Sequence, residues 1–69
     1  MDAARLVKST AAAQGLTLSQ VADKFGTSQQ NFSKRLQVGR FTLSEWERIA
    51  DALGCKLYFG FELPDGRMI

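Results

Sequence analysis

The sequence predicts a mostly helical domain of four to five helices that ends in a β-strand or a short hairpin. Apolar residues recur with the helical period of about 3.6 as far as Leu53, and from Leu57 onward they alternate with a period of about 2. A length of 69 residues fits one small domain. We therefore divide the chain into a helical unit at residues 1–54 and a terminal strand or hairpin at residues 55–69.

Each of four predicted helices follows a residue that can cap a helix N-terminus. Thr17 and Thr42 are followed three residues later by Gln20 and Glu45, which is the spacing of a capping box. Glycines follow three of the four segments, where a left-handed residue ends a helix without steric cost. The expected helices span residues 3–14, 18–25, 29–37 and 43–53, are capped by Asp2, Thr17, Ser28 and Thr42, and end, except for the third, at Gly15, Gly26 and Gly54.

The spacing of apolar residues indicates which face of each helix is buried. The first helix has a weak apolar face, because alanine and threonine stand where larger aliphatic residues would pack better, so its packing must be close. The expected core positions are Leu6, Val7, Thr10 and Ala13 or Gln14 on the first helix, Val21, Ala22 and Phe25 on the second, Phe32 and Leu36 on the third, and Leu43, Trp46, Ile49, Ala50 and Leu53 on the fourth.

The segment after Gly54 has the pattern of a half-buried strand followed by a tight turn. Its apolar and polar residues alternate, and aromatic residues are frequent. Pro64 suits an early turn position and Gly66 supplies a positive φ, so residues 67–69 can return as a short second strand.

Four large apolar side chains on one strand need cover that a short turn does not give. Antiparallel pairing with the same strand of a second copy would cover them, so we expect a homodimer. The alternative is that the hairpin packs on the first and last helices of its own chain. The expected dimer interface consists of Leu57, Phe59, Phe61 and Leu63.

Composition excludes several classes of protein. One cysteine and no histidine provide neither an intrachain disulfide nor the usual zinc ligands, and we expect no metal, no cofactor and no small-molecule ligand. The same absence of histidine, together with the lack of paired carboxylates and of a phosphate-binding loop, leaves no catalytic residues, so we expect no enzyme. No segment has the pattern of a membrane span or a signal peptide, so we expect a cytoplasmic protein without a membrane partner.

Charge is unevenly distributed along the chain. Nine basic residues stand against seven acidic ones, and no acid occurs from Lys24 to Ser44. A basic window of this kind is compatible with a solvated surface, but it also suits a nucleic-acid partner.

The second and third predicted helices are separated by about three residues, so they must cross steeply and stay in contact. Ala22 is small enough for the close approach at the crossing, and Gly26 allows the turn. With these residues, both capping boxes and the flanking helices, residues 16–54 resemble the helix-turn-helix of the Cro and phage-repressor (XRE) family, most closely in TLSQVADKFGTSQQNFSKRL. This resemblance implies a lambda-repressor-like fold whose third helix lies in the DNA major groove.

Helical geometry indicates which side of the third helix faces outward. With Phe32 and Leu36 in the core, Gln30, Lys34 and Gln37 point most directly away from it. All three are polar, as an exposed face requires.

Expected base contacts combine this geometry with the resemblance. Gln29 lies at the tip of the helix and matches a family position that contacts bases, and a glutamine amide can pair with N6 and N7 of adenine. Arg35 stands where the family usually has an aliphatic residue, so a rotation of the helix by one residue would exchange Ser33 for Lys34. The expected base contacts are Gln29, Gln30, Ser33 and Lys34.

Phosphate contacts are expected from the start of the second helix and from the basic window, because helix N-termini and cations attract anions. These residues are Thr17, Ser19, Gln20, Lys24, Ser28, Arg35 and Arg40.

Two functions follow from these features. The first is a sequence-specific DNA-binding transcriptional regulator, a repressor that binds a palindromic operator in double-stranded DNA as a homodimer. The second is a protein-interaction module, antitoxin-like or an assembly subunit, in which the helical unit is a scaffold and the terminal strand binds another polypeptide by β-augmentation.

Overall fold

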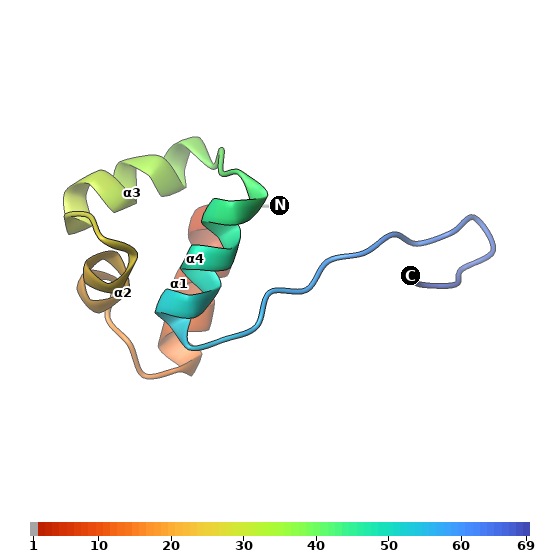
Figure 1. Ribbon diagram of the computed structural model, residues 1–69, viewed down its shortest axis with the longest axis horizontal. Coiled ribbons are helices and arrows are strands. Elements are labelled where there is room, and N and C mark those ends of the chain that lie inside the picture. The colour runs from red at the N-terminus through yellow and green to blue at the C-terminus, as the bar shows by residue number, and fades with distance from the viewer. Residues whose placement is uncertain (1) are drawn as a thin grey trace.

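The computed structural model describes residues 2–69. It contains four helices, which confirms the mostly helical class, and each helix end lies within one residue of its predicted position. The helices form a body at one end of the molecule, and the residues after Gly54 leave this body as an extended tail (Figure 1). The helices are α1 (Ala3–Ala13), α2 (Leu18–Phe25), α3 (Gln29–Val38) and α4 (Leu43–Leu53).

Both predicted capping boxes form. Oγ1 of Thr17 accepts a hydrogen bond from the Gln20 amide at 3.1 Å, and the Thr17 amide donates to Oε1 of Gln20 at 2.8 Å. Thr42 and Glu45 make the same pair of bonds at the start of α4, at 3.1 and 3.0 Å. Gly39, which the glycine pattern did not single out, ends α3 with a φ of 75°.

The core lies where the inner faces of the four helices meet. Phe32 of α3 and Val21 of α2 are completely buried there, and the rings of Phe25 and Phe32 pack with their centroids 5.2 Å apart. All core positions predicted on α2 and α3 are buried.

The predicted buried face of α1 is wrong in part. Ala3, Val7 and Ala11 are the buried residues of this helix, whereas Leu6 is 45% exposed. The small alanines turn toward the body because α1 lies close to α2 and α3, and this rotation leaves Leu6 at the rim. Thr10 is half-buried, and Ala13 and Gln14 are exposed.

On α4 the prediction holds for the middle and the end of the helix. Ile49, Ala50 and Leu53 are buried, but Leu43 in the first turn is 51% exposed. Trp46 is half-buried rather than central, and its ring packs on Phe41, the residue before the N-cap Thr42, with a centroid distance of 5.1 Å, which is the contact of a hydrophobic staple.

The predicted C-terminal strand is not formed. Among residues 2–69 the backbone pairing of the tail is confined to its end, where one isolated antiparallel bridge joins Glu62 and Met68 and hydrogen bonds link residues 61 and 63 to residues 69 and 67. The predicted turn is present, because the Gly66 amide donates to the carbonyl of Leu63 at 2.9 Å. Residues 56–60 are extended without a neighbouring strand, and a strand requires a partner for its N–H and C=O groups.

The tail also does not fold back on the helices of its own chain as a packed hairpin, the alternative arrangement. It leads away from α1 and α4 (Figure 1), and Phe59 and Phe61 are 69% and 74% exposed. Leu57 lies closest to the helical body and is 39% exposed, and Leu63 is half-buried.

Candidate nucleic-acid interface

The turn between α2 and α3 holds the two helices at a steep crossing (Figure 1). Gly26 adopts a φ of 99°, and its amide donates to the carbonyl of Ala22 at 2.9 Å. The amide of Thr27 donates to the same carbonyl at 3.0 Å. Ala22 itself is completely buried, so the crossing has no space for a larger side chain. These contacts fix the direction in which α3 leaves the turn.

The rotation of α3 about its own axis agrees with the sequence prediction. Phe32 and Leu36 are 0% and 2% exposed and face the core. Gln30, Lys34 and Gln37 are exposed on the other side of the helix. The third helix therefore presents a polar face that other parts of residues 2–69 do not cover.

Ser33 is half-buried and lies nearer to the body than Lys34, which is exposed. This difference favours Lys34 over Ser33 as the more accessible of the two predicted base contacts.

The tip of α3 carries polar side chains that are free to bind a partner. Gln29 and Gln30 are exposed, and their side chains make no hydrogen bond within residues 2–69. Ser28 caps the helix, because its hydroxyl oxygen accepts from the Asn31 amide at 3.2 Å. Each glutamine amide offers one acceptor and two donors, which is the set of groups that can pair with an adenine edge.

At the start of α2, the capping box uses the oxygens of Thr17 and Gln20 but leaves their hydrogens free. The hydroxyl hydrogen of Thr17 and the Nε2 group of Gln20 remain as donors, and Ser19 beside them is exposed. Donors at a helix N-terminus suit contacts to phosphate oxygens.

Three cations lie together at the C-terminal end of α3. Lys34, Arg35 and Arg40 line, with Val38, a shallow hollow of about 260 Å³. We call these three cations the basic corner. Lys24 is also exposed, in the last turn of α2, so the positive charge of the sequence window lies on α2, α3 and the loop that follows α3.

Arg35 differs from the other members of the basic corner, because other residues of the chain hold its charge. Its Nη2 lies 2.6 Å from Oε2 of Glu45, and its guanidinium lies 4.7 Å from the centroid of the Phe41 ring. The backbone amide of Thr42, and then the Arg35 guanidinium, lower the pKa of Glu45 below its ordinary value of 4.5. Arg35 therefore links α3 to the start of α4.

Arg48 supports the turn between α2 and α3 although the sequence prediction does not include it. Its Nη2 donates to the carbonyl of Phe25 at 2.6 Å, and its guanidinium lies 4.2 Å from the centroid of the Phe25 ring. The contact joins α4 to the last residue of α2, immediately before Gly26. The only signal in the sequence is that Arg48 is the single basic residue among the acids of α4.

The residues predicted for the dimer interface lie apart from α3. The tail that carries Leu57, Phe59, Phe61 and Leu63 extends from the end of α4, on the opposite side of the body from α3 (Figure 1). The structure therefore separates the predicted DNA contacts from the predicted interface.

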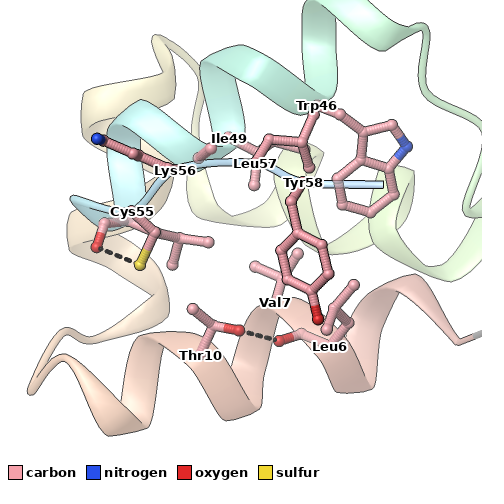
Figure 2. Close-up of a pocket in the computed structure, with 11 residues that line it drawn as sticks. Leu6, Val7, Thr10, Trp46, Ile49, Cys55, Lys56, Leu57 and Tyr58 are labelled. Atoms are coloured by element: carbon pink, nitrogen blue, oxygen red, sulfur yellow. Dashed lines mark hydrogen bonds between the residues drawn. The ribbon is translucent and has the colours of Figure 1, made fainter. Parts of the chain in front are cut away.

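A second hollow, of about 310 Å³, lies between α1, α4 and the beginning of the tail. In Figure 2, Tyr58 stands across this hollow between Trp46 and Leu6. Two polar groups of the hollow are hydrogen-bonded: the Thr10 hydroxyl donates to the carbonyl of Leu6 at 2.8 Å, and the Cys55 thiol donates to that of Leu53 at 3.5 Å. We call this second hollow the apolar groove. Its lining residues are Leu6, Val7, Thr10, Trp46, Ile49, Ala50, Leu53, Cys55, Lys56, Leu57 and Tyr58.

Within residues 2–69, histidine, cysteine, aspartate and glutamate side chains do not gather in groups of three as metal ligands would. In the same residues, none of the four helices has the length and apolar character that crossing a bilayer requires. Comparison of the chain with models of known protein families, with curated proteins and with solved structures finds no match.

Proposed function

We propose that the protein is a sequence-specific DNA-binding regulator that places α3 in the major groove of double-stranded DNA. The observation that supports this most directly is the exposed polar face of α3 at Gln30, Lys34 and Gln37. A helix of 10 residues is about 15 Å long and its diameter suits a major groove about 12 Å wide. The steep crossing of α2 and α3 supports the resemblance of residues 16–54 to the XRE family and its lambda-repressor-like fold.

Base recognition is assigned in this proposal to residues 29–34 of α3. Gln29 and Gln30 pair with adenine through their amides, and Lys34 donates to O6 or N7 of guanine. Ser33, which is half-buried, contacts a base at the side of the DNA major groove.

Phosphate contacts come from two sides of α3. Donors at the start of α2 contact one part of the backbone, and Arg40 of the basic corner contacts another. Arg35 acts as a positioning residue, because Glu45 holds its guanidinium. The assigned residues are Thr17, Ser19, Gln20, Lys24, Ser28 and Arg40.

The proposed protein acts as a homodimer that represses by occupying a palindromic operator. A palindromic operator would require the α3 helices of the two copies to lie about 34 Å apart, one turn of DNA. Such a regulator works in the compartment that holds the DNA, and we propose the cytoplasm.

The test is a titration of a labelled duplex of random sequence at several salt concentrations. If α3 and the basic corner contact phosphates, log K should fall with log salt by about 0.9 for each phosphate neutralised. Lys34→Glu should weaken binding at least about tenfold, whereas Lys8→Glu, an equal charge change at an exposed position of α1, should have a much smaller effect. Equal losses of affinity for the two variants, or an affinity that does not depend on salt concentration, would contradict the proposal.

A protein-interaction module is the second candidate. It is favoured by residues 56–60, whose extended backbone makes no hydrogen bond within residues 2–69 and is open to β-augmentation. Absence of duplex binding at low salt would favour this function over DNA binding.

A further inference from the structure

We propose that the tail, residues 55–69, pairs with the tail of a second copy in a single antiparallel register centred on Phe59. In this register Lys56 of each copy lies opposite Glu62 of the partner copy. This inference rests on the proposed function in one respect, because it specifies how the two copies of the proposed homodimer pair. It is carried by the backbone of the tail, by charge complementarity and by the exposed aromatic residues.

The tail uses one of its two backbone edges for its own turn. Phe61 and Ile69 exchange both backbone hydrogen bonds, at 2.9 and 2.8 Å, and the Leu63 amide donates to the carbonyl of Arg67 at 2.7 Å. Odd-numbered residues therefore direct their N–H and C=O groups toward the returning segment.

Successive residues of an extended chain direct these groups to opposite edges. The even-numbered residues consequently direct theirs to the other edge, where no hydrogen bond forms within residues 2–69. We call this the outer edge. It consists of the backbone groups of Lys56, Tyr58, Gly60 and Glu62, and an unpaired row of this kind is a template for another strand.

Only one self-pairing uses all four residues of the outer edge. Across a two-fold axis at Phe59, Lys56 pairs with Glu62 of the partner copy, and Tyr58 pairs with Gly60 of the partner copy. A register centred on Tyr58 would instead place Glu62 opposite Gly54, at the end of α4, and leave its charge without a counterpart.

The side chains agree with this register. Lys56 and Glu62 form no ion pair within residues 2–69, so both charges are available for the partner. Opposite charges directly across a strand pair attract each other. Tyr58 is 93% exposed, so its side chain is accessible to the partner copy.

The other face of the paired tails would bury apolar side chains. Phe59 lies against its own copy at the axis, and Leu57 lies beside Phe61 of the partner copy. Because Leu57 lines the apolar groove, the partner's Phe61 would cover the mouth of that groove. The second copy thus supplies the cover that residues 2–69 do not give to these side chains.

Charge reversal provides a direct test, because Lys56→Glu alone and Glu62→Lys alone each create like charges at both ends of the pairing. Each variant should associate at least about tenfold more weakly than the unaltered protein, as measured by sedimentation equilibrium without DNA. An equimolar mixture of the two variants should form heterodimers with nearly the original affinity. In such a heterodimer one copy has acidic side chains at positions 56 and 62, and the other copy has basic side chains at both positions. Each acidic side chain then lies opposite a basic one. Lys8→Glu, the matched control, should associate normally.

A cysteine scan tests the register itself. In a Cys55→Ser background, Phe59→Cys places two thiols directly opposite each other in a non-hydrogen-bonded pair with Cα atoms about 4.5 Å apart, close enough for a disulfide. Tyr58→Cys, Phe61→Cys and the exposed Val38→Cys should cross-link far less under mild oxidation. Helical circular dichroism checks folding, because these positions lie outside the core.

The outcomes separate this inference from the proposed function. Preferred cross-linking at Tyr58, or a mixture that fails to associate, would overturn the register. Duplex binding depends on α3, so loss of DNA binding by Lys34→Glu with intact association leaves the tail inference standing. Conversely, monomers of Lys56→Glu that still bind a half-site duplex leave the DNA proposal standing.

Discussion

Gln30 stands at the tip of α3 with an exposed amide that no other group of residues 2–69 engages. Gln30→Ala should therefore weaken binding to the preferred duplex by about 1 to 3 kcal/mol, because the bidentate pairing with a base is lost. Binding to random duplex should change little, since the alanine variant keeps all phosphate contacts. Competition gel shifts with both duplexes measure the difference.

Gln37→Ala is the matched control for this substitution. Gln37 is exposed on the same face of α3 but near its C-terminal end, which the proposed docking places further from the base edges. Equal losses on preferred and random duplex for Gln30→Ala would refute base recognition at this position.

Glu45 makes stability depend on pH. The pKa of its carboxyl is lowered in the folded protein, by the Thr42 amide and then by Arg35, so the unfolded chain binds its proton more readily. The stabilising contribution is fully present above the ordinary value of 4.5 and is lost as the pH falls through the lowered pKa. Glu45→Gln should remove this part of the acid sensitivity.

Urea denaturation at neutral pH and at several values below 4.5 measures this effect. Arg35→Met, which removes the second cause of the shift, should flatten the same dependence in part. A Glu45→Gln protein that loses stability on acidification as steeply as the unaltered protein would contradict the assignment.

Single residues were predictable from sequence where burial follows from strong apolar spacing. Phe32 and Leu36 are the only large apolar residues on the inner side of α3, so their burial fixed its rotation. Leu6 was misplaced because periodicity favours large side chains, whereas close helix packing selects the small Ala3 and Ala11. The contacts of Arg48 depend on a long flexible side chain reaching another helix, and spacing does not encode that reach.

At the scale of elements, Arg48 connects α4 to the end of α2. Arg48→Met keeps the aliphatic part of the side chain but loses the hydrogen bond to the Phe25 carbonyl and the contact with its ring. We expect a loss of about 1 kcal/mol in the free energy of unfolding, measured by urea denaturation followed by circular dichroism.

Arg5→Met on α1 is the control for Arg48→Met, because within residues 2–69 the Arg5 side chain makes neither a hydrogen bond nor an ion pair. It should leave the free energy of unfolding nearly unchanged. If both variants lose the same stability, the contact with Phe25 is not what stabilises α2.

Helices were predictable as elements because their ends depend on nearby residues. Thr17 and Gln20 form their capping box within one turn, and Gly26 ends the same helix. A strand depends instead on a partner that its own residues do not specify. The alternation at residues 57–63 correctly indicated an extended chain, but the pairing it implied is absent apart from the bridge at Glu62.

At the scale of the whole molecule, the tail lies outside the core that holds the helices together. Phe59→Lys should therefore yield monomers in sedimentation velocity while leaving the helical circular dichroism unchanged. A lysine at the proposed axis would lie against its own copy, and like charges there repel. A dimer that persists in this variant would show that another surface mediates association.

Charge is also separated across the molecule. The basic corner lies at the C-terminal end of α3, whereas the acids Glu47 and Asp51 line a hollow beside the root of the tail. A net charge of +2 thus understates how strongly one side could attract phosphates. Composition indicated the basic window, but only the fold brought Arg40 next to Lys34.

The position of Trp46 has a practical consequence. It is the single tryptophan of the chain, and it lies in the wall of the apolar groove rather than on α3. Its emission spectrum is a natural optical reporter of whatever happens at the root of the tail. The proposed self-association can thus be followed without a dye, separately from binding to labelled DNA.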